Sequence, residues 1–344
     1  MPKKSQSQRQ TIQLIVDILN FETSDAVLKQ HLLSNAMDWD SIVSVASKHL
    51  VLTSVFCRLQ QKSLLGCLPE DLKLYLEELT ELNRNRNRSL LNEVQQISKL
   101  FERNQIDHVF VKGVALLAGN YFKDIGERMI GDIDILIASK DLDFAFELLV
   151  KEGYSQFIEF NYEVKNYRHL PRQISKTRLA AVELHSQLLK HTYNHLIDKD
   201  LLLTNKEFNN GVAIPNSNHS IWNAILGQQI NDGSYYYNVL KLKGLYDVLN
   251  ANLPEKKELL NELSTEKHCL RFLGLASIFC PSIGPTKSDF NLHLHKKMFL
   301  LKLKFPKLGS WIFKMKSLSV GIQERFLLFF FNKSYREHVI KNKL

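Results

Sequence analysis

The chain lacks several features that would assign it to a specialised class. Its four cysteines, Cys57, Cys67, Cys269 and Cys280, match no short zinc-ligand spacing, so we expect buried thiols rather than a metal site. No window reaches the ~18 consecutive apolar residues of a membrane span. The first residues, MPKKSQSQRQ, are polar and basic, and no apolar run typical of a secretory signal follows them. We therefore expect a cytoplasmic protein.

Acidic residues are scarce in the last part of the chain. Residues 293–344, which we call the basic tail, contain twelve Lys and Arg but only Glu324 and Glu337, a net charge of +10. Subtraction from the chain totals of 45 basic and 36 acidic residues leaves 33 and 34 for the body. In the tail, basic residues alternate with Phe, Leu and Trp. This composition suits an anionic membrane surface, which would place the protein at the inner face of the membrane, a nucleic acid, or a helical lobe with a solvated basic face. The sequence leaves these three open.

The pattern of apolar residues divides the remaining chain into regions of helical and mixed periodicity. Spacings of three and four residues dominate on both sides of a central region with short β-branched runs. We expect five segments: a disordered basic segment 1–10, a helical N-terminal lobe 11–105, an α/β core 106–215, a helical C-terminal lobe 216–292, and the basic tail 293–344 as amphipathic helix.

The N-terminal lobe contains two clear helix starts. Asp38 or Asp40 can cap the helical pattern DWDSIVSVASKHLVLTSVFCRL, and Pro69 precedes a long pattern that continues to Gln105. This second pattern includes the run NRNRNR, residues 83–88. Because alternate residues of a helix do not share a face, we interpret the run as solvated helix surface rather than an RNA-binding element.

The central region has the alternation of an α/β fold. IDHVFVKG and GDIDILIA read as strands, DLDFAFELLVKEGY as a helix that ends at Gly153, and Ala180 to Leu184 as a further strand. These elements predict a small mixed sheet with helices around it.

Two acids interrupt the second of these strands. Residues two apart in a strand project to the same side, so Asp132 and Asp134 share one face while the isoleucines between and after them share the other. Two adjacent carboxylates raise each other's pKa unless a cation lies between them, and Mg²⁺ is commonly bound by one or two carboxylates plus substrate phosphates. A lone Asp-x-Asp pair is more often a solvated strand end than a metal site, so the residues around it must distinguish the two interpretations.

That context contains further groups suited to phosphate chemistry. FVKG ends a strand at Gly113, where a helix-like stretch begins, and Lys112 adds a positive charge. In AVELHSQLL, Glu183 and His185 share one face of another strand. Three carboxylates on two strands are the ligand set of two-metal phosphoryl or nucleotidyl transfer.

The segment FVKGVALLAGNYFKDIGERMIGDIDILI, followed by VELHSQLL, resembles the family of uncharacterised nucleotidyltransferases within the DNA polymerase beta-like superfamily. The resemblance extends over about residues 30 to 250. It includes the helical N-terminal pattern, the Pro-led long helix, an arginine before Asp-x-Asp, Glu-Leu-His, and the later helix LKLKGLYDVL.

The resemblance implies roles for individual residues. Gly113 would belong to the nucleotide-binding turn, and Asp132 and Asp134 would hold Mg²⁺ or Mn²⁺. Glu183 would be the third carboxylate, either ligand or general base. Candidates for the triphosphate are Arg128 and Lys112, while His185 matches a family histidine without an assigned role.

The sequence also departs from the family pattern. Val114 follows Gly113 where Gly-Ser or Gly-Gly is usual, and Ser186 replaces an aromatic residue. A histidine of the next helix is replaced by Gln228 or Gln229.

Several outer residues have weaker signals. Lys241 and Lys243 could contact phosphates, and Asp247 lies one helical turn after Lys243, at the spacing of an ion pair. Tyr235 to Tyr237 offer a stacking surface for a base, although a core or interface role is more common for such a run. His191 and His195 have a zinc-compatible spacing, but no third ligand accompanies them.

The sequence therefore predicts an α+β nucleotidyltransferase core between helical lobes, transferring an NMP group from an NTP, ATP being one such donor, to an unidentified acceptor hydroxyl. The acceptor classes are a small molecule, a sugar, a protein and an RNA. Two alternatives stay open. One is an inactive descendant that binds nucleotide or a partner, and the other is a nucleic-acid or membrane module that acts through the basic tail.

Overall fold

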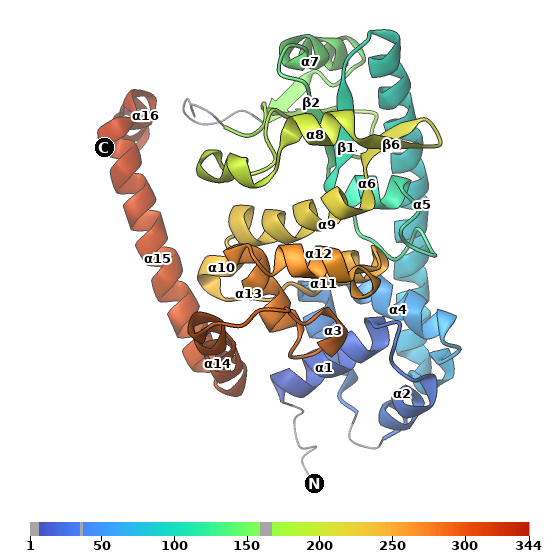
Figure 1. Cartoon of the computed structure of the whole chain (residues 1–344). Helices are drawn as coiled ribbons and strands as arrows, with labels where there is room; N and C mark the ends of the chain where they lie inside the picture. The colour runs from blue at the N-terminus through green and yellow to red at the C-terminus, as the bar shows by residue number, and fades with distance from the viewer. Residues whose placement is uncertain (1–6, 35–36, 159–166, 344) are drawn as a thin grey trace.

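The computed structural model describes residues 7–34, 37–158 and 167–343 (Figure 1). Helices dominate at both ends of the chain, and the strands lie between them, which confirms the predicted α+β class. The α-helices are α1 Gln8–Leu19, α2 Asp25–Leu32, α3 Trp39–Lys48, α4 Leu52–Gln61, α5 Glu70–Arg103, α6 Lys112–Ala118, α7 Leu142–Lys151, α8 Lys199–Thr204, α9 Ser217–Leu226, α10 Ser234–Tyr237, α11 Leu242–Asn250, α12 Lys257–Leu263, α13 Lys267–Ala276, α14 Phe290–Lys304, α15 Pro306–Phe331 and α16 Lys333–Lys343.

The N-terminal helices follow the sequence signals closely, with two differences. α1 begins at Gln8, inside the segment 1–10 that we expected to be disordered, and residues 1–6 lie outside the described part of the chain. Asp38 caps α3 by accepting a hydrogen bond from the backbone N–H of Ser41 at 3.0 Å. The pattern after Asp38 forms two helices rather than one, because α3 and α4 meet at a 120° bend where Leu50 has a φ of 56°.

A five-stranded mixed sheet occupies the centre of the molecule, in the order β1-β2-β5-β4-β3. β1 pairs antiparallel with β2, and β2 pairs parallel with β5. A hairpin of β6 and β7 follows, with Asn210 and Gly211 at positive φ in its turn. The strands are β1 His108–Val111, β2 Ile133–Ile137, β3 Gln156–Ile158, β4 Arg172–Ile174, β5 Val182–His185, β6 Lys206–Asn209 and β7 Val212–Pro215.

The run NRNRNR lies in α5 and does not form the solvated surface that we expected. Asn83 and Asn87 are buried and donate their side-chain amides to backbone carbonyls of the loop between α6 and β2. Arg84 binds Asp124 of the same loop through both of its carboxylate oxygens, at 2.6–3.0 Å. The prediction was wrong because residues four apart share a helix face, and here that face meets a loop with unpaired carbonyls.

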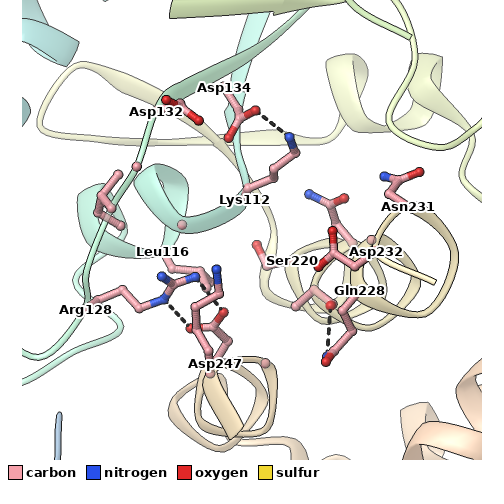
Figure 2. Close-up of a pocket in the computed structure, with 18 of the residues that line it drawn as sticks. Lys112, Leu116, Arg128, Asp132, Asp134, Ser220, Gln228, Asn231, Asp232 and Asp247 are labelled. Atoms are coloured by element: carbon pink, nitrogen blue, oxygen red, sulfur yellow. Dashed lines mark hydrogen bonds and ion pairs between the residues drawn. The ribbon is translucent and has the colours of Figure 1, made fainter. Parts of the chain in front are cut away.

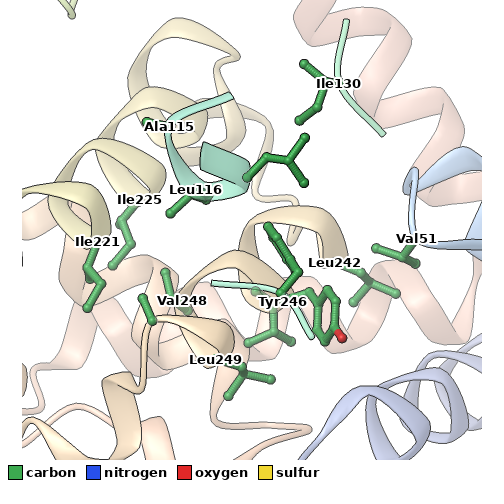
Figure 3. Packing of buried hydrophobic residues seen from close by; sticks show 14 of the residues in the cluster. Val51, Ala115, Leu116, Ile130, Ile221, Ile225, Leu242, Tyr246, Val248 and Leu249 are labelled. Carbon is green, nitrogen blue, oxygen red and sulfur yellow. The ribbon is translucent and has the colours of Figure 1, made fainter. Parts of the chain in front are cut away.

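The C-terminal helices α9 and α11 pack against α6 and α4 to form much of the core near the sheet. Figure 3 shows Leu116 of α6 among Ile221 and Ile225 of α9, with Tyr246 and Val248 of α11 beside them. Each of these side chains is almost fully buried. This packing fixes the C-terminal helices relative to the part of the sheet where Asp134 lies in β2 and Lys112 directly follows β1.

The basic tail contains α14, α15 and α16 (Figure 1). α14 is anchored to the body by the buried side chains of Leu292, Phe299 and Leu303, whereas no residue of α15 is buried. Over the described ranges, no single helix has the length and apolar character to cross a bilayer, although the bent pair α3 and α4 satisfies that criterion jointly. The four cysteines are free thiols, and Cys67 is the one that is partly exposed.

Candidate active site

A cavity of about 360 Å³ lies between the sheet and the C-terminal helices (Figure 2). One end is formed by Lys112, Asp132, Asp134, Arg172 and Glu183 at the sheet. The other end is formed by side chains from α9, from the π-helical turn Gly227–Asn231 that follows it, and from α11. The cavity therefore has an acid-rich end at the sheet, which we call the ionic end, and a helical end lined by both amide and charged side chains.

Register places the acids of β2 and β5 side by side. Asp134 pairs with Glu183 across the parallel ladder, so both side chains project from the same face of the sheet. His185 lies two residues after Glu183 on that face, and its Nε2 is 2.8 Å from Asp134 Oδ1 and 3.4 Å from Glu183 Oε2. The ring is fully buried, and its Nδ1 has no hydrogen-bond partner among the described residues.

Two cations balance these carboxylates. Lys112 Nζ lies 2.5 Å from Asp134 Oδ1 and 4.0 Å from Glu183 Oε2. Arg172 of β4 bridges Asp132 at 2.8 Å and Glu183 at 3.0 Å through the same Nη2. Lys112 follows β1 directly and has a φ of 60°, an uncommon backbone conformation for a residue with a Cβ. The turn from β1 into α6 thus places the amine of Lys112 next to Asp134 and Glu183.

The carboxylates respond differently to their surroundings. Burial would raise the pKa of Asp134, but Lys112 and His185 outweigh it and lower the pKa. The pKa of Glu183 is also lowered, because His185, His169 and Lys112 together exceed the effect of burial. The pKa of Asp132 is raised by burial, with Arg172 opposing the shift. Asp134 and Glu183 are therefore held ionised.

The donor set fits a divalent cation. Ligand atoms of Asp134, Glu183 and His185 all lie within 4.8 Å of one another, and carboxylate oxygens are the ligands that Mg²⁺ and Mn²⁺ prefer. Asp132 precedes β2 and is joined to Glu183 through Arg172 rather than belonging to that closest group. An ion held by the carboxylates would take over charge balance that Lys112 and Arg172 provide here.

The remaining predicted nucleotide-binding residues have mixed surroundings. Arg128 is buried and binds both carboxylate oxygens of Asp247, at 2.7 and 3.0 Å. The predicted ion pair between Asp247 and Lys243 is therefore replaced by one with Arg128, because the loop before β2 passes directly over α11. Lys241 binds Asp232 at 2.7 Å.

Lys243 lines the cavity and, among the residues that the structure describes, makes no hydrogen bond or ion pair. Burial lowers the pKa of its amine, and the neighbouring Arg128 contributes in the same direction. The carboxylates of Asp247 and Asp232 oppose this shift in pKa, and Lys243 lines the same cavity as the acids of the sheet.

The structure shows what surrounds Gly113 and two of the positions that depart from the family pattern, Val114 and Gln228. A Cβ on Gly113 would lie 2.9 Å from Ile130 Cδ1 and 3.2 Å from Arg128 Nη2, so the loop packs where a side chain would stand. Val114 is fully buried in the hydrophobic core. Of the two glutamines, Gln228 lines the cavity, and its Oε1 is buried without a hydrogen-bond partner among the described residues.

Two groups singled out in the sequence lie elsewhere. Tyr235 contacts His268 of α13 with ring centroids 4.6 Å apart, and Tyr237 contacts Phe313 of α15 at 4.7 Å. The tyrosine run therefore packs against C-terminal helices rather than the ionic end of the cavity. His191 and His195 lie on a short 3₁₀ helix and belong to no cluster of three ligands in the described chain.

Sequence reasoning missed Arg172, Asn83 and Asn87. The two asparagines hold the carbonyl of Arg128 at 3.3 and 2.8 Å, and so position the loop that leads into Asp132. Their spacing of four residues on a helix was the available signal. No comparable signal in the sequence indicated Arg172, because only the order of the strands brings β4 next to Glu183.

Comparison with protein families assigns the class. The model of the uncharacterised nucleotidyltransferase family matches residues 35–283, which include the sheet, the acids and helices α3 to α13. The chain belongs to this family and is an enzyme of the nucleotidyltransferase class. Searches of curated proteins and of solved structures gave no match.

Proposed function

We propose that the protein transfers an NMP group from an NTP to a hydroxyl of an acceptor, with Mg²⁺ or Mn²⁺ held by Asp132, Asp134 and Glu183. The observation that supports this most is the register of Asp134 with Glu183 at the ionic end of the cavity. Two carboxylates on adjacent strands, with a third just before one of them, suit metal-assisted nucleotidyl transfer.

The reaction exchanges one phosphoester bond for another. The acceptor oxygen forms a bond to the α-phosphorus, the bond from that phosphorus to the oxygen bridging to the β-phosphate breaks, and pyrophosphate leaves with the electron pair. The hydroxyl proton passes to solvent or to a nearby carboxylate. A divalent ion at the carboxylates would neutralise charge on the phosphate oxygens during this exchange.

Glu183 is suited to holding an ion rather than to mobile proton transfer. Its Oε1 accepts hydrogen bonds from Arg172 at 3.0 and 3.1 Å, and its Oε2 faces His185. Both oxygens are therefore fixed in position, and the lowered pKa makes the carboxylate a weak base.

Lys112, Arg172 and Lys243 are the proposed phosphate contacts. Their charged groups line the cavity, and Lys112 and Arg172 already contact the acids. We give Arg128 a different role. Its guanidinium also donates to the carbonyl of Met129 at 2.6 Å, so it ties the loop to α11 instead of meeting a triphosphate.

The test is an incubation of the protein with each α-labelled NTP, Mg²⁺ or Mn²⁺ and host-cell extract. The Asp132→Ala, Asp134→Ala double variant should lose at least about a thousandfold in label transfer, because metal contributes several kcal/mol to such transition states. Asp200→Asn, which changes an exposed acid on α8, is the matched control and should retain full transfer.

Calorimetry separates the possible outcomes. Metal-dependent NTP binding without transfer would identify an inactive nucleotide-binding protein. Equal transfer by wild type and the double variant would refute the role of the acids, whatever the acceptor.

A further inference from the structure

The helix α15 is long and has no buried residue. It spans Pro306–Phe331, 26 residues, and none of them is buried. Figure 1 shows it running along one side of the molecule from α14 to α16. Large apolar side chains occupy much of this surface, which is unusual because monomeric proteins rarely leave extended apolar patches in water. Such a surface calls for a binding partner.

Seven of the exposed apolar side chains of α15 form a stripe on one face, while Phe313, Leu327, Phe330 and Phe331 lie outside it. Members recur every three or four residues, the spacing that keeps them on one side of an α-helix. Their exposed fractions lie between 36% and 62%. The apolar stripe consists of Leu308, Trp311, Met315, Leu318, Ile322, Phe326 and Phe329.

The stripe faces away from the body. α15 touches the body through Phe313, whose ring centroid is 4.7 Å from that of Tyr237, and through Lys316, whose Nζ donates to the carbonyl of Tyr236 at 2.8 Å. At about 100° per residue, Phe313 lies roughly half a turn from Trp311 and Met315. The contacts with the body therefore leave the stripe on the outer side.

Basic residues border the stripe on one edge. Lys307, Lys314 and Arg325 each directly precede a member of the stripe and are seven and eleven residues apart, so they lie on the same side of the helix. Long basic side chains beside an apolar face can extend toward charged headgroups while their stems stay in the apolar layer. Trp311, near the start of the stripe, has the amphipathic ring that favours such an interface.

We propose that α15 lies on an anionic lipid surface, with the apolar stripe among the acyl chains and the basic edge at the phosphates. The charge of the tail selects this partner. α15 itself has four basic residues and one acidic residue, a net charge of +3 within the +10 of the whole tail. This charge opposes the approach of a second copy of the same helix, while an anionic headgroup layer attracts it. The apolar stripe distinguishes this surface from a purely electrostatic nucleic-acid site.

The experiment measures binding of the full-length protein to phosphatidylcholine vesicles with and without phosphatidylglycerol. Wild type should bind the anionic vesicles and shift the emission of Trp311 to shorter wavelength, with Trp311→Phe used to assign the signal. Leu318→Gln combined with Ile322→Gln should weaken binding at least about a hundredfold, since two large apolar side chains no longer leave water.

The matched control is Ser310→Gln combined with Ser317→Gln, which places the same residue at two exposed positions outside the stripe, on the side of α15 that carries Phe313, and should leave vesicle binding unchanged. Replacing Lys307, Lys314 and Arg325 by Gln should weaken binding to anionic vesicles about a hundredfold, with little change for phosphatidylcholine alone. Because α15 buries none of its residues, each variant should unfold at the wild-type temperature.

Four results would overturn the proposal. The first is failure of wild type to bind anionic vesicles. The second is equal loss in both glutamine doubles. The third is a wild-type dimer that the stripe variant converts to a monomer while vesicle binding is absent, which would assign the stripe to a second copy. Binding of a single-stranded oligonucleotide in place of vesicles would equally exclude a lipid surface.

Discussion

The two longest helices of the protein have opposite relations to water. α5, with 34 residues, is rich in charged and amide side chains, yet it buries Leu76, Leu90 and Val94 together with Asn83 and Asn87. α15, with 26 residues and many aromatic and aliphatic side chains, buries none. Hydropathy alone would reverse these locations. The difference lies in the contacts of each helix: α5 faces the loop that leads to the acids, while the described residues leave the apolar stripe of α15 exposed.

The largest effect on stability should come from the buried ion pair between Arg128 and Asp247. It joins α11 to the loop between α6 and β2, which the asparagines of α5 hold in place. Arg128→Ala leaves Asp247 as an unpaired buried carboxylate, and we expect a loss of about 3–5 kcal/mol in the free energy of unfolding. Urea unfolding measures this. Arg88→Ala is the control on α5, because the ion pair of Arg88 with Glu81 is exposed on both sides.

A double variant checks whether the loss comes from the unpaired charge. Arg128→Met with Asp247→Leu removes both partners and should recover much of the stability, without restoring the exact position of the loop. If the double variant is as unstable as Arg128→Ala, packing rather than charge explains the loss.

The next effect compares equivalent leucines of the two helices. Leu90→Ala in α5 should cost about 2–5 kcal/mol of unfolding free energy, because the side chain is completely buried. Leu318→Ala in α15, where 59% of the side chain is exposed, should change it by less than about 0.5 kcal/mol. Similar losses at both positions would show that α15 packs against the body in solution.

A smaller effect is expected at the asparagines of α5. Asn87→Ala removes the donor for the carbonyls of Ile125 and Arg128, at 2.5 and 2.8 Å, and should cost about 1–3 kcal/mol. Nucleotidyl transfer should fall as well, because the loop leads directly into Asp132. Asn85→Ala, on the exposed face, should change neither quantity. A normal rate in Asn87→Ala would show that the loop does not position the acids.

The last prediction concerns the effect of low pH on the helical lobe near α5. Burial, with Lys241 and Lys48, lowers the pKa of His49 to about 4, and its Nδ1 accepts a hydrogen bond from the N–H of Leu242. The unfolded chain binds this proton below its ordinary pKa of 6.5, so stability should fall as pH decreases from 6.5 to 4. His49→Asn keeps an acceptor and should flatten that slope in unfolding experiments at pH 7 and 4.5. An unchanged slope would assign the proton to another group.

The sequence was enough to predict the strands that carry the three acids. Alternation in IDILI indicated a strand, and the same-face rule placed Asp132 and Asp134 together; Glu183 was found by the same reasoning. Their positions in a shared cavity agree with this expectation, although their catalytic roles are still predictions. The parallel pairing of β2 with β5 could not be derived, because strand order depends on contacts across fifty residues of chain.

Other features were missed although local signals existed. Asn-Gly is a typical pair of hairpin-turn residues, and the β6–β7 hairpin forms at Asn210 and Gly211. The break between α3 and α4 had no comparable signal, since Leu50 is a poor residue for positive φ and tertiary packing imposes it. The division into domains that we drew from composition is likewise still a prediction.

Lys112 has a left-handed backbone conformation that residues other than Gly and Asn rarely adopt. Such a conformation costs on the order of 1 kcal/mol, so the protein holds its cation over Asp134 at the expense of local stability. Glycine at this position would relax the backbone and remove the amine in one step. A search for stabilising substitutions would therefore favour a change that deprives the site of its nearest positive charge, and selection for stability alone would work against the site.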